Sequence, residues 1–260
     1  MQFFNRSFFS GILLVIIAVG LAAGCSRKLM REEELLDEQF YFDRGMKMMK
    51  KKDYIKAITD FQTVVDSYSD KPIVDHAQFM LGEAHFMAEE YLTAAFEFER
   101  VYTDYPSSPF APEAQYKKAL CYYMESPDAR LDQANTQLAI DEFNRFIDTY
   151  PTNDLVEEAQ KKIAELQAKM AYKEYLNGET YRKLKDYDAA IFYYRWVIKE
   201  YPRTIWSDYS RYRIAETHFK KKEYELAHER LLVVINADVD KDLRKKAVDL
   251  MDKIESELSK

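Results

Sequence analysis

The sequence predicts an all-α protein built as an array of repeated helix pairs. Aromatic and small residues recur at a constant spacing of 37 residues in two parts of the chain, as in repeat proteins. The pairs are Tyr54–Tyr91, Ala57–Ala94, Phe61–Phe98 and Tyr187–Tyr224. Only 6 Gly and 7 Pro occur in 260 residues, while aromatic residues make up 15%. This composition is typical of an ordered chain and argues against a disordered or collagen-like one.

Residues 186–202, DYDAAIFYYRWVIKEYP, show the repeating unit most clearly. Asp186 is expected to open a helix and Tyr201-Pro202 to close it, because proline lacks an amide proton and disfavours a helical residue before it. The buried face of this helix repeats as Ala190, Tyr194 and Val197, and Gly178 and Tyr181 lie on the helical stretch before it. This order of residues resembles the tetratricopeptide repeat, a helix–turn–helix unit of about 34 residues. The resemblance implies a superhelix of about five such repeats plus a C-terminal capping helix.

The five repeats differ in regularity. Repeats one and two are expected at about 37–70 and 75–107, and repeat five follows repeat four at an offset of 37. Repeat three contains about eight extra residues, because Ala94 corresponds to Ala139, and the insertion includes the turn sequence Ser126-Pro127-Asp128. Residues 155–184 contain no proline and predict one long helix, or two nearly continuous ones, with an N-cap at Asn153-Asp154. Leu243, Val248, Met251, Ile254 and Leu258 predict the capping helix.

Residues 1–24 have the features of a lipoprotein signal peptide. Arg6 precedes the apolar run Phe8–Ala23, which at 16 residues is shorter than the ~20 residues needed to span a bilayer. The following Leu21-Ala22-Ala23-Gly24-Cys25 resembles the bacterial lipoprotein cleavage box, although the leucine lies one residue further from the cysteine than usual. The resemblance implies acylation of Cys25, including palmitate, and Ser26 after it fits sorting to the outer membrane. An ordinary signal peptide that ends near a cysteine is the alternative.

The remaining chain is expected to divide into three parts. Residues 25–36 would form the lipidated tether, residues 37–152 the N-terminal repeats one to three, and residues 153–260 the C-terminal repeats four and five with the capping helix. Cys121 is the second of the two cysteines and corresponds to Ala84 of the preceding repeat. We therefore expect Cys121 to fill a position where two helices approach closely.

Charge and motifs exclude several classes of function. The net charge is −7 and no block of Lys or Arg occurs, which argues against a nucleic-acid partner. The four histidines have no metal-ligand spacing, and His85 and His218 share the repeat position of Tyr122 and Tyr181. No glycine-rich phosphate loop or nucleophile motif is present. We expect no enzymatic activity, no catalytic or metal-binding residues, and no cofactor.

Two rows of apolar residues on the first helices of the repeats are candidates for a peptide-binding groove. In tetratricopeptide arrays the first helices line the concave face, and a groove lined with Met and aromatic residues suits extended peptides. The candidates are Phe42, Met46, Met49, Phe79, Phe86, Tyr116 and Tyr123. Phe42, Phe79 and Tyr116 form one row with 37-residue spacing, and Met49, Phe86 and Tyr123 form another. The alternative is that these side chains are buried between helices.

The lipoprotein box, the repeats of about 37 residues with Tyr-Pro ends, and the insertion in repeat three together resemble the repeat lipoproteins of the outer-membrane barrel-assembly machinery. The Tyr-Pro pairs are Tyr105-Pro106, Tyr150-Pro151 and Tyr201-Pro202. The resemblance implies a non-enzymatic scaffold on the periplasmic face of the outer membrane, held in the bilayer through acylated Cys25. Its implied partners are unfolded outer-membrane proteins, the periplasmic domains of the barrel insertase and other lipoproteins of the machinery.

Two alternatives remain at this stage. One is a periplasmic adaptor of the Tol–Pal envelope-division system, whose repeats are similar but usually follow a coiled coil without lipidation. The other is a lipoprotein enzyme on a helical toroid or a nutrient-binding lipoprotein with an inserted ligand domain. The short distance from Cys25 to repeat one disfavours the first, and the missing catalytic constellation and long insertion disfavour the second.

Overall fold

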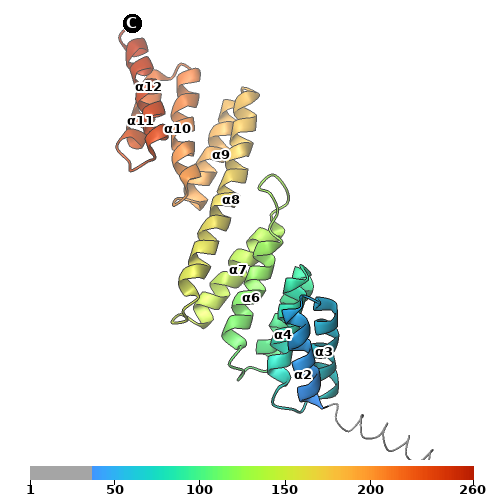
Figure 1. Ribbon diagram of the computed structural model, residues 1–260. Coiled ribbons are helices and arrows are strands. Elements are labelled where there is room, and N and C mark those ends of the chain that lie inside the picture. The colour runs from blue at the N-terminus through green and yellow to red at the C-terminus, as the bar shows by residue number, and fades with distance from the viewer. Residues whose placement is uncertain (1–36) are drawn as a thin grey trace, which may run out of the picture. The chain divides into compact units, whose positions relative to one another are not determined.

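The computed structural model describes residues 37–260, and within this range the chain forms eleven α-helices and no β-strand. The predicted signal peptide of residues 1–24, Cys25 and the tether of residues 25–36 lie outside the described residues. Ten helices form five consecutive helix–turn–helix pairs, and the eleventh follows them (Figure 1). The predicted all-α tetratricopeptide-repeat fold, with five repeats and a capping helix, is confirmed for these residues.

The first two pairs belong to one compact unit, which ends at Phe110. Its helices are α2 (Glu38–Lys50), α3 (Tyr54–Ser67), α4 (Val74–Met87) and α5 (Tyr91–Asp104). Phe42, Phe61, Val64 and Leu81 are buried together in its core. The apolar residues recur every three or four positions, so each helix has one apolar face that must be covered by a neighbour.

The second compact unit runs from Ala111 to Lys260. Its helices are α6 (Ala111–Met124), α7 (Ala134–Thr149), α8 (Val156–Lys183), α9 (Tyr187–Glu200), α10 (Ile205–Lys220), α11 (Tyr224–Ile235) and α12 (Lys241–Leu258). The long stretch before repeat four is thus a single helix of 28 residues. Cys121 on α6 is fully buried, as its correspondence to Ala84 predicted.

Side-chain hydrogen bonds cap the first turns of four described helices, α2, α3, α9 and α12. Asp53 and Asp186 are the N-caps of α3 and α9, and their side chains accept hydrogen bonds from Lys56 N and Ala189 N. The expected N-cap of α8 at Asn153-Asp154 is wrong, because Leu155 occupies that position without a side-chain hydrogen bond. Asn153 Oδ1 instead accepts from Leu155 N at 2.9 Å, so its side chain stabilises the turn before the helix.

The insertion in repeat three is held by hydrogen bonds inside the second unit. Gln133 Nε2 donates to the carbonyls of Asp128 and Leu131, at 2.8 and 3.1 Å. Lys169 on α8 donates to Ser126 Oγ at 2.8 Å. These contacts satisfy backbone carbonyls that a longer loop leaves without helical partners.

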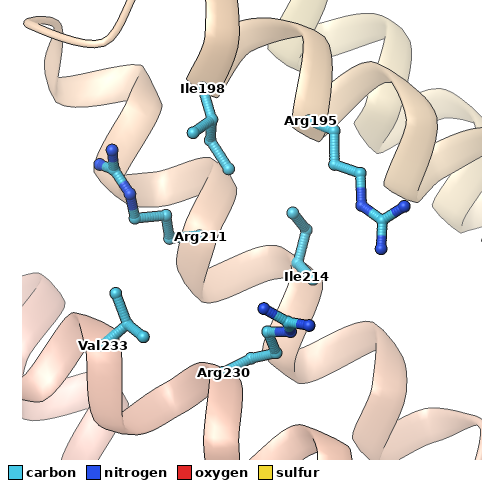
Figure 2. Close-up of a pocket in the computed structure, with 6 residues that line it drawn as sticks. All are labelled: Arg195, Ile198, Arg211, Ile214, Arg230 and Val233. Atoms are coloured by element: carbon cyan, nitrogen blue, oxygen red, sulfur yellow. The ribbon is translucent and has the colours of Figure 1, made fainter.

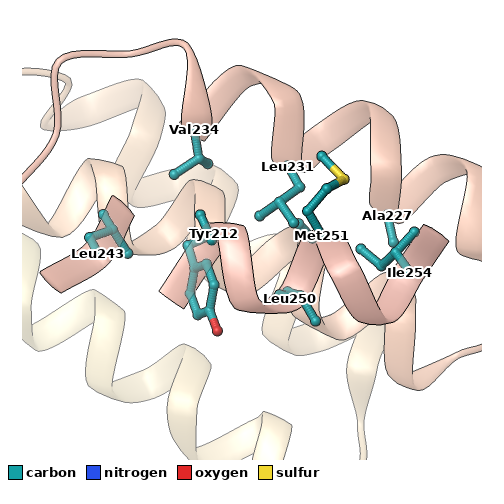
Figure 3. Packing of buried hydrophobic residues seen from close by; sticks show 10 residues of the cluster. Tyr212, Ala227, Leu231, Val234, Leu243, Leu250, Met251 and Ile254 are labelled. Atoms are coloured by element: carbon teal, nitrogen blue, oxygen red, sulfur yellow. The ribbon is translucent and has the colours of Figure 1, made fainter. Parts of the chain in front are cut away.

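Helix α12 covers the end of the repeat array. Leu243, Leu250 and Ile254 of α12 pack with Tyr212 of α10 and Leu231 of α11 (Figure 3). A terminal repeat has no following repeat to bury its apolar face, and α12 supplies that cover. None of the helices from residue 37 onward combines the length and the apolar character needed to cross a bilayer.

Candidate functional site

The first predicted groove row, Phe42, Phe79 and Tyr116, is buried. Each ring packs on an aromatic ring of its own helix pair, with centroid distances of 5.7 Å from Phe42 to Phe61 and 5.6 Å from Phe79 to Phe98. Tyr116 packs in the same way on Phe143, at 5.6 Å. Desolvation by burial raises the pKa of Tyr116. This burial favours a packing role for the row over direct contact with a peptide.

The other predicted groove residues, Met46, Met49, Phe86 and Tyr123, are half-buried. Met46 and Met49 lie at the edge of the core of the first unit. Phe86 packs edge-on against Tyr91, with 5.2 Å between ring centroids. Part of each of these side chains stays accessible. In the first unit a ligand can therefore contact Met46 and Met49 on α2 and Phe86 on α4.

Tyr123 combines an accessible ring with a fixed hydroxyl in the second unit. Its Oη donates to Glu165 Oε2 at 2.7 Å, and this hydrogen bond, with some desolvation, raises the pKa of Tyr123 to about 12. Lys162 Nζ lies 4.3 Å from the ring centroid, within cation–π distance. The ring is therefore held in one orientation against α8.

His76 lies between two aromatic rings of the first unit. Its ring centroid is 4.7 Å from that of Phe42 and 4.5 Å from that of Phe110. Desolvation by burial lowers the pKa of His76, although the Asp75 carboxylate opposes this effect. The neutral imidazole thus acts as a third aromatic ring in the packing of α4.

Two other histidines share one structural role. His85 Nδ1 lies 2.6 Å from Glu90 Oε2, and His218 Nδ1 lies 2.6 Å from Glu223 Oε2. Both pairs join the end of a first helix to the start of a second helix, where repeats one and four use an aspartate N-cap. Within residues 37–260 no group of three or more His, Cys, Asp or Glu side chains is placed to hold a metal ion.

A buried ionic network, not anticipated from the sequence, joins α8, α9 and α10. Glu179 pairs with Arg182 at 2.8 Å and with Arg213 at 3.0 Å, and its Oε1 accepts from Tyr194 Oη at 2.6 Å. Desolvation acts to raise the pKa of Glu179, but the hydrogen bonds from Arg182 and Tyr194 and the two positive charges outweigh it and lower the pKa. Glu179 therefore stays ionised at the centre of repeat four.

A cavity of about 370 Å³ opens between α9, α10 and α11. Its lining consists of three arginines and three aliphatic residues, and Ile214 lies between Arg195 and Arg230 in Figure 2. They are Arg195, Ile198, Arg211, Ile214, Arg230 and Val233. The sequence contained a signal for this cavity, since an arginine is followed three residues later by Ile or Val on three successive helices.

Two curated proteins named outer membrane protein assembly factor BamD are similar to this chain. The protein from Rickettsia prowazekii (strain Madrid E) is 27% identical over 208 residues, which cover 80% of this chain and 83% of that protein. The protein from Caulobacter vibrioides (strain ATCC 19089 / CIP 103742 / CB 15) is 26% identical over 210 residues, which cover 80% and 68% respectively.

Solved structures with a similar course of helices include tetratricopeptide domains of low sequence identity. The TPR2AB domain of yeast Sti1 in a complex with pHSP90 is 14% identical with a TM-score of 0.40, covering 86% of this chain and 98% of that one. The P58(IPK) TPR domain is 13% identical with a TM-score of 0.42, covering 90% and 69%.

The family assignment rests on a match over most of the chain. The sequence profile of the YfiO family, described as an outer membrane lipoprotein, matches residues 34–209, which include the first four helix pairs. The chain therefore belongs to the YfiO family of outer membrane lipoproteins.

Proposed function

We propose that the protein is a lipid-anchored scaffold subunit of the machinery that assembles outer-membrane barrel proteins. The observation that carries this proposal is the similarity to two proteins named as outer membrane protein assembly factors, each over 80% of the chain. The array of helix pairs supports a binding role, because stacked repeats present extended surfaces to other polypeptides. On this proposal the protein performs no chemical step.

The two ends of the array would bind different partners. Repeats one to three, residues 37–152, would receive unfolded outer-membrane proteins, and the half-buried Met46, Met49 and Phe86 offer apolar contacts for such chains. Repeats four and five, residues 153–260, would dock the periplasmic domains of the barrel insertase. The accessible arginines of the second unit give that region a surface chemistry different from that of the first.

Anchoring through Cys25 would hold this scaffold on the periplasmic face of the outer membrane. One acyl chain gives a membrane affinity of only about 10⁴ M⁻¹, whereas several chains on one residue anchor a protein durably. The relatives give no support to the envelope-division alternative, since both are named for outer-membrane protein assembly.

Photocrosslinking tests the binding of unfolded clients. A photoreactive residue in place of Met49 or Phe86 in the full-length protein is expected to form adducts with newly exported barrel proteins in living cells. The same residue in place of Phe61, which is fully buried, serves as the control and should give adducts only within the chain. Adducts confined to the chain at all three positions would contradict client binding at this surface.

Affinity purification tests the docking of the insertase. The lipidated protein, extracted in mild detergent, is expected to retain the barrel insertase. Recovery of envelope-division proteins in its place would overturn the proposal in favour of the adaptor alternative.

A further inference from the structure

We infer that the cavity between α9, α10 and α11 docks an acidic segment of a partner polypeptide, in which a carboxylate side chain is flanked by apolar residues. The inference deepens the proposed function and rests on it, since it names the chemistry by which repeats four and five recognise a partner. Four of the six lining residues lie beyond residue 209, where the family match ends.

An arginine and an aliphatic residue three positions later line the cavity on each of three helices. Arg195 and Ile198 come from α9, Arg211 and Ile214 from α10, and Arg230 and Val233 from α11. Residues three apart lie on one face of a helix, so each helix presents one guanidinium beside one aliphatic side chain. Figure 2 shows the resulting arrangement, with Ile214 between Arg195 and Arg230 and with Ile198 and Val233 on either side of Arg211. The volume of about 370 Å³ accommodates a few side chains of a partner.

The positive charge of this cavity is only partly balanced from within. Arg211 Nη1 pairs with Asp208 at 2.7 Å. Arg230 meets only its neighbour Glu229, at 3.9 Å, and both side chains are largely exposed. Arg195 makes no ion pair with any residue of the described chain. In a protein whose net charge is −7, three arginines around an apolar floor attract a ligand that is both acidic and apolar.

The first unit provides an internal comparison at equivalent positions. Tyr54 and Tyr91 correspond to Tyr187 and Tyr224 at an offset of 133 residues. At the same offset Arg195, Arg211 and Arg230 become Gln62, Gln78 and Glu97, while Ile198 and Ile214 become the buried Val65 and Leu81. Two of the three apolar positions are thus kept, Val233 becomes Arg100, and all three arginines are replaced.

Two of the polar residues at these positions bind each other in the first unit. Gln78 Nε2 donates to Glu97 Oε2 at 2.6 Å, and both residues are buried. In the second unit the residue at the place of Glu97 is Arg230, and no carboxylate lines the cavity. The carboxylate that the first unit contains within its own chain must come from a ligand in the second.

A polypeptide is the occupant that fits this arrangement. Guanidinium groups bind carboxylates with two parallel hydrogen bonds, and an acidic residue beside a Leu, Ile or Phe places both required groups within one turn of a chain. The three arginines lie on separate helices around the apolar centre, so several groups of one segment can be contacted at once. An anionic lipid headgroup would offer the same charge and is an outcome that the test distinguishes.

A photocrosslinker in the cavity identifies the occupant. The full-length protein carries p-benzoylphenylalanine in place of Val233, which is 54% exposed and therefore tolerates substitution, and is irradiated in its own membrane. We expect one dominant polypeptide adduct, whose crosslinked segment contains Asp or Glu next to apolar residues. An adduct with lipid, or a segment without an acidic residue, would overturn the inference.

Charge variants show whether the arginines cause the binding. Arg195→Glu, Arg211→Glu and Arg230→Glu, combined in the crosslinking protein, are expected to lower the adduct yield about 10-fold or more. Gln62→Glu, at the position equivalent to Arg195 in the first unit, should leave the yield unchanged. An unaltered yield in the triple variant would contradict the inference. Replacement of the captured acidic residue by Lys should restore the yield with the triple variant and abolish it with native arginines.

Two further measurements keep folding and function separate from docking. The three Arg→Lys variants keep the charge and the aliphatic stems, so an intermediate yield with native helix content by circular dichroism supports recognition by the guanidinium groups. A yield equal to that of the native arginines would show that positive charge alone suffices and would contradict recognition by the guanidinium groups. If the adduct yield is the same with and without the arginines, but depletion of the protein still removes barrel proteins from the outer membrane, the docking inference fails and the proposed function stands. If depletion has no such effect, the proposed function fails irrespective of the cavity.

Discussion

Three glycines on first helices determine how closely the two helices of a repeat approach. A Cβ atom on Gly45, Gly82 or Gly178 would lie 2.7, 2.7 or 2.5 Å from a ring carbon of the second helix. The facing rings are those of Phe61, Phe98 and Tyr194, each 16 residues further along the chain. Repeats three and five use Ala119 with Phe143 and Ala215 with Leu231, both pairs fully buried. In repeats one, two and four the ring opposite leaves no room for a Cβ atom, whereas repeat three contains both Ala119 and Phe143.

Substitution of one of these glycines should destabilise its unit. Gly82→Ala places a methyl group 2.7 Å from Phe98, and overpacking of this kind typically costs about 1–3 kcal/mol in the free energy of unfolding. Urea unfolding followed by circular dichroism measures the loss. The double variant Gly82→Ala/Phe98→Leu reproduces the Ala215–Leu231 combination and should recover part of the stability. No recovery would show that the ring is not the source of the cost.

Four residues in the turns within repeats adopt left-handed backbone conformations without being glycine. Lys52, Glu89, Lys185 and Lys222 have φ angles of 60°, 62°, 64° and 65°, each just before the N-cap of a second helix. The turn geometry requires this conformation, in which a Cβ atom approaches the backbone, at a cost of roughly 1 kcal/mol.

Relief of this strain should stabilise the fifth repeat. Lys222→Gly is expected to raise the free energy of unfolding by about 0.5–1 kcal/mol, because glycine adopts positive φ without a Cβ penalty. Lys220→Gly, two residues earlier and inside α10, is the matched control and should give no gain. Differential scanning calorimetry would detect the difference, and equal effects of the two variants would contradict the strain argument.

At the scale of helices, the Glu179 network fixes the packing of α8 against α9 and α10. Removal of one partner from a buried ion pair leaves the other uncompensated and typically costs 3–5 kcal/mol. Glu179→Gln is therefore expected to lose about 3 kcal/mol at pH 7. Glu157→Gln, in the exposed pair with Lys161, should leave the stability nearly unchanged.

The loss of stability caused by Glu179→Gln depends on pH with a definite sign. The pKa of Glu179 in the folded protein is lowered below its unfolded value of about 4.3. Its contribution to stability is full above that unfolded pKa and is lost as the pH falls through the folded pKa. Urea unfolding at several pH values should show the difference between native protein and Glu179→Gln shrinking below about pH 4. A difference that stays constant down to pH 2 would contradict the role of the ionised carboxylate.

Helix α12 should be required for the order of repeat five. It buries Leu243, Leu250 and Ile254 against α10 and α11, and each fully buried side chain of this size contributes about 1.5–3 kcal/mol. A chain ending at Asp240 is expected to exchange amide hydrogens faster in α10 and α11, with unchanged exchange in α4 and α5. A chain ending at Ser256, which keeps Leu243, Leu250 and Ile254, is the control and should behave as the full chain.

Most of the fold could be predicted from the sequence, because each repeat carries its own aromatic and small residues at fixed spacing. The bounds of α9, the single long helix α8 and the capping helix follow from this local pattern. The N-cap of α8 could not be predicted. The Asn153 side chain accepts a hydrogen bond from Leu155 N in the turn before the helix and does not cap the helix itself. The same spacing does not reveal whether a ring faces a groove or its partner helix. Phe42, Phe79 and Tyr116 fit a groove by their spacing, and the structure shows them buried.

The site residues that sequence reasoning missed come together only through packing. Glu179, Arg182 and Arg213 lie on two helices of different repeats, and nothing in their local sequence distinguishes them from surface charges. The arginine cavity likewise needs three helices to converge. Repeats make local structure predictable, whereas contacts between repeats depend on the fold.

At the scale of the whole molecule, two compact units carry the same repeat with different surfaces. The first keeps its polar groups paired internally at Gln78 and Glu97, and the second presents Arg195, Arg211 and Arg230 at the equivalent positions. A scaffold that binds unfolded clients and a folded partner needs such a difference, because the two ligands have different chemistry. Membership of an outer membrane lipoprotein family places this array in the cell envelope.

Depletion of the protein from growing cells, followed by quantitative mass spectrometry of the outer membrane, tests the assembly role most directly. Barrel proteins are expected to fall several-fold, while lipoproteins without a barrel keep their abundance. Re-expression of the native chain should restore the barrel proteins. Unchanged amounts of barrel proteins after complete depletion would contradict a role in their assembly.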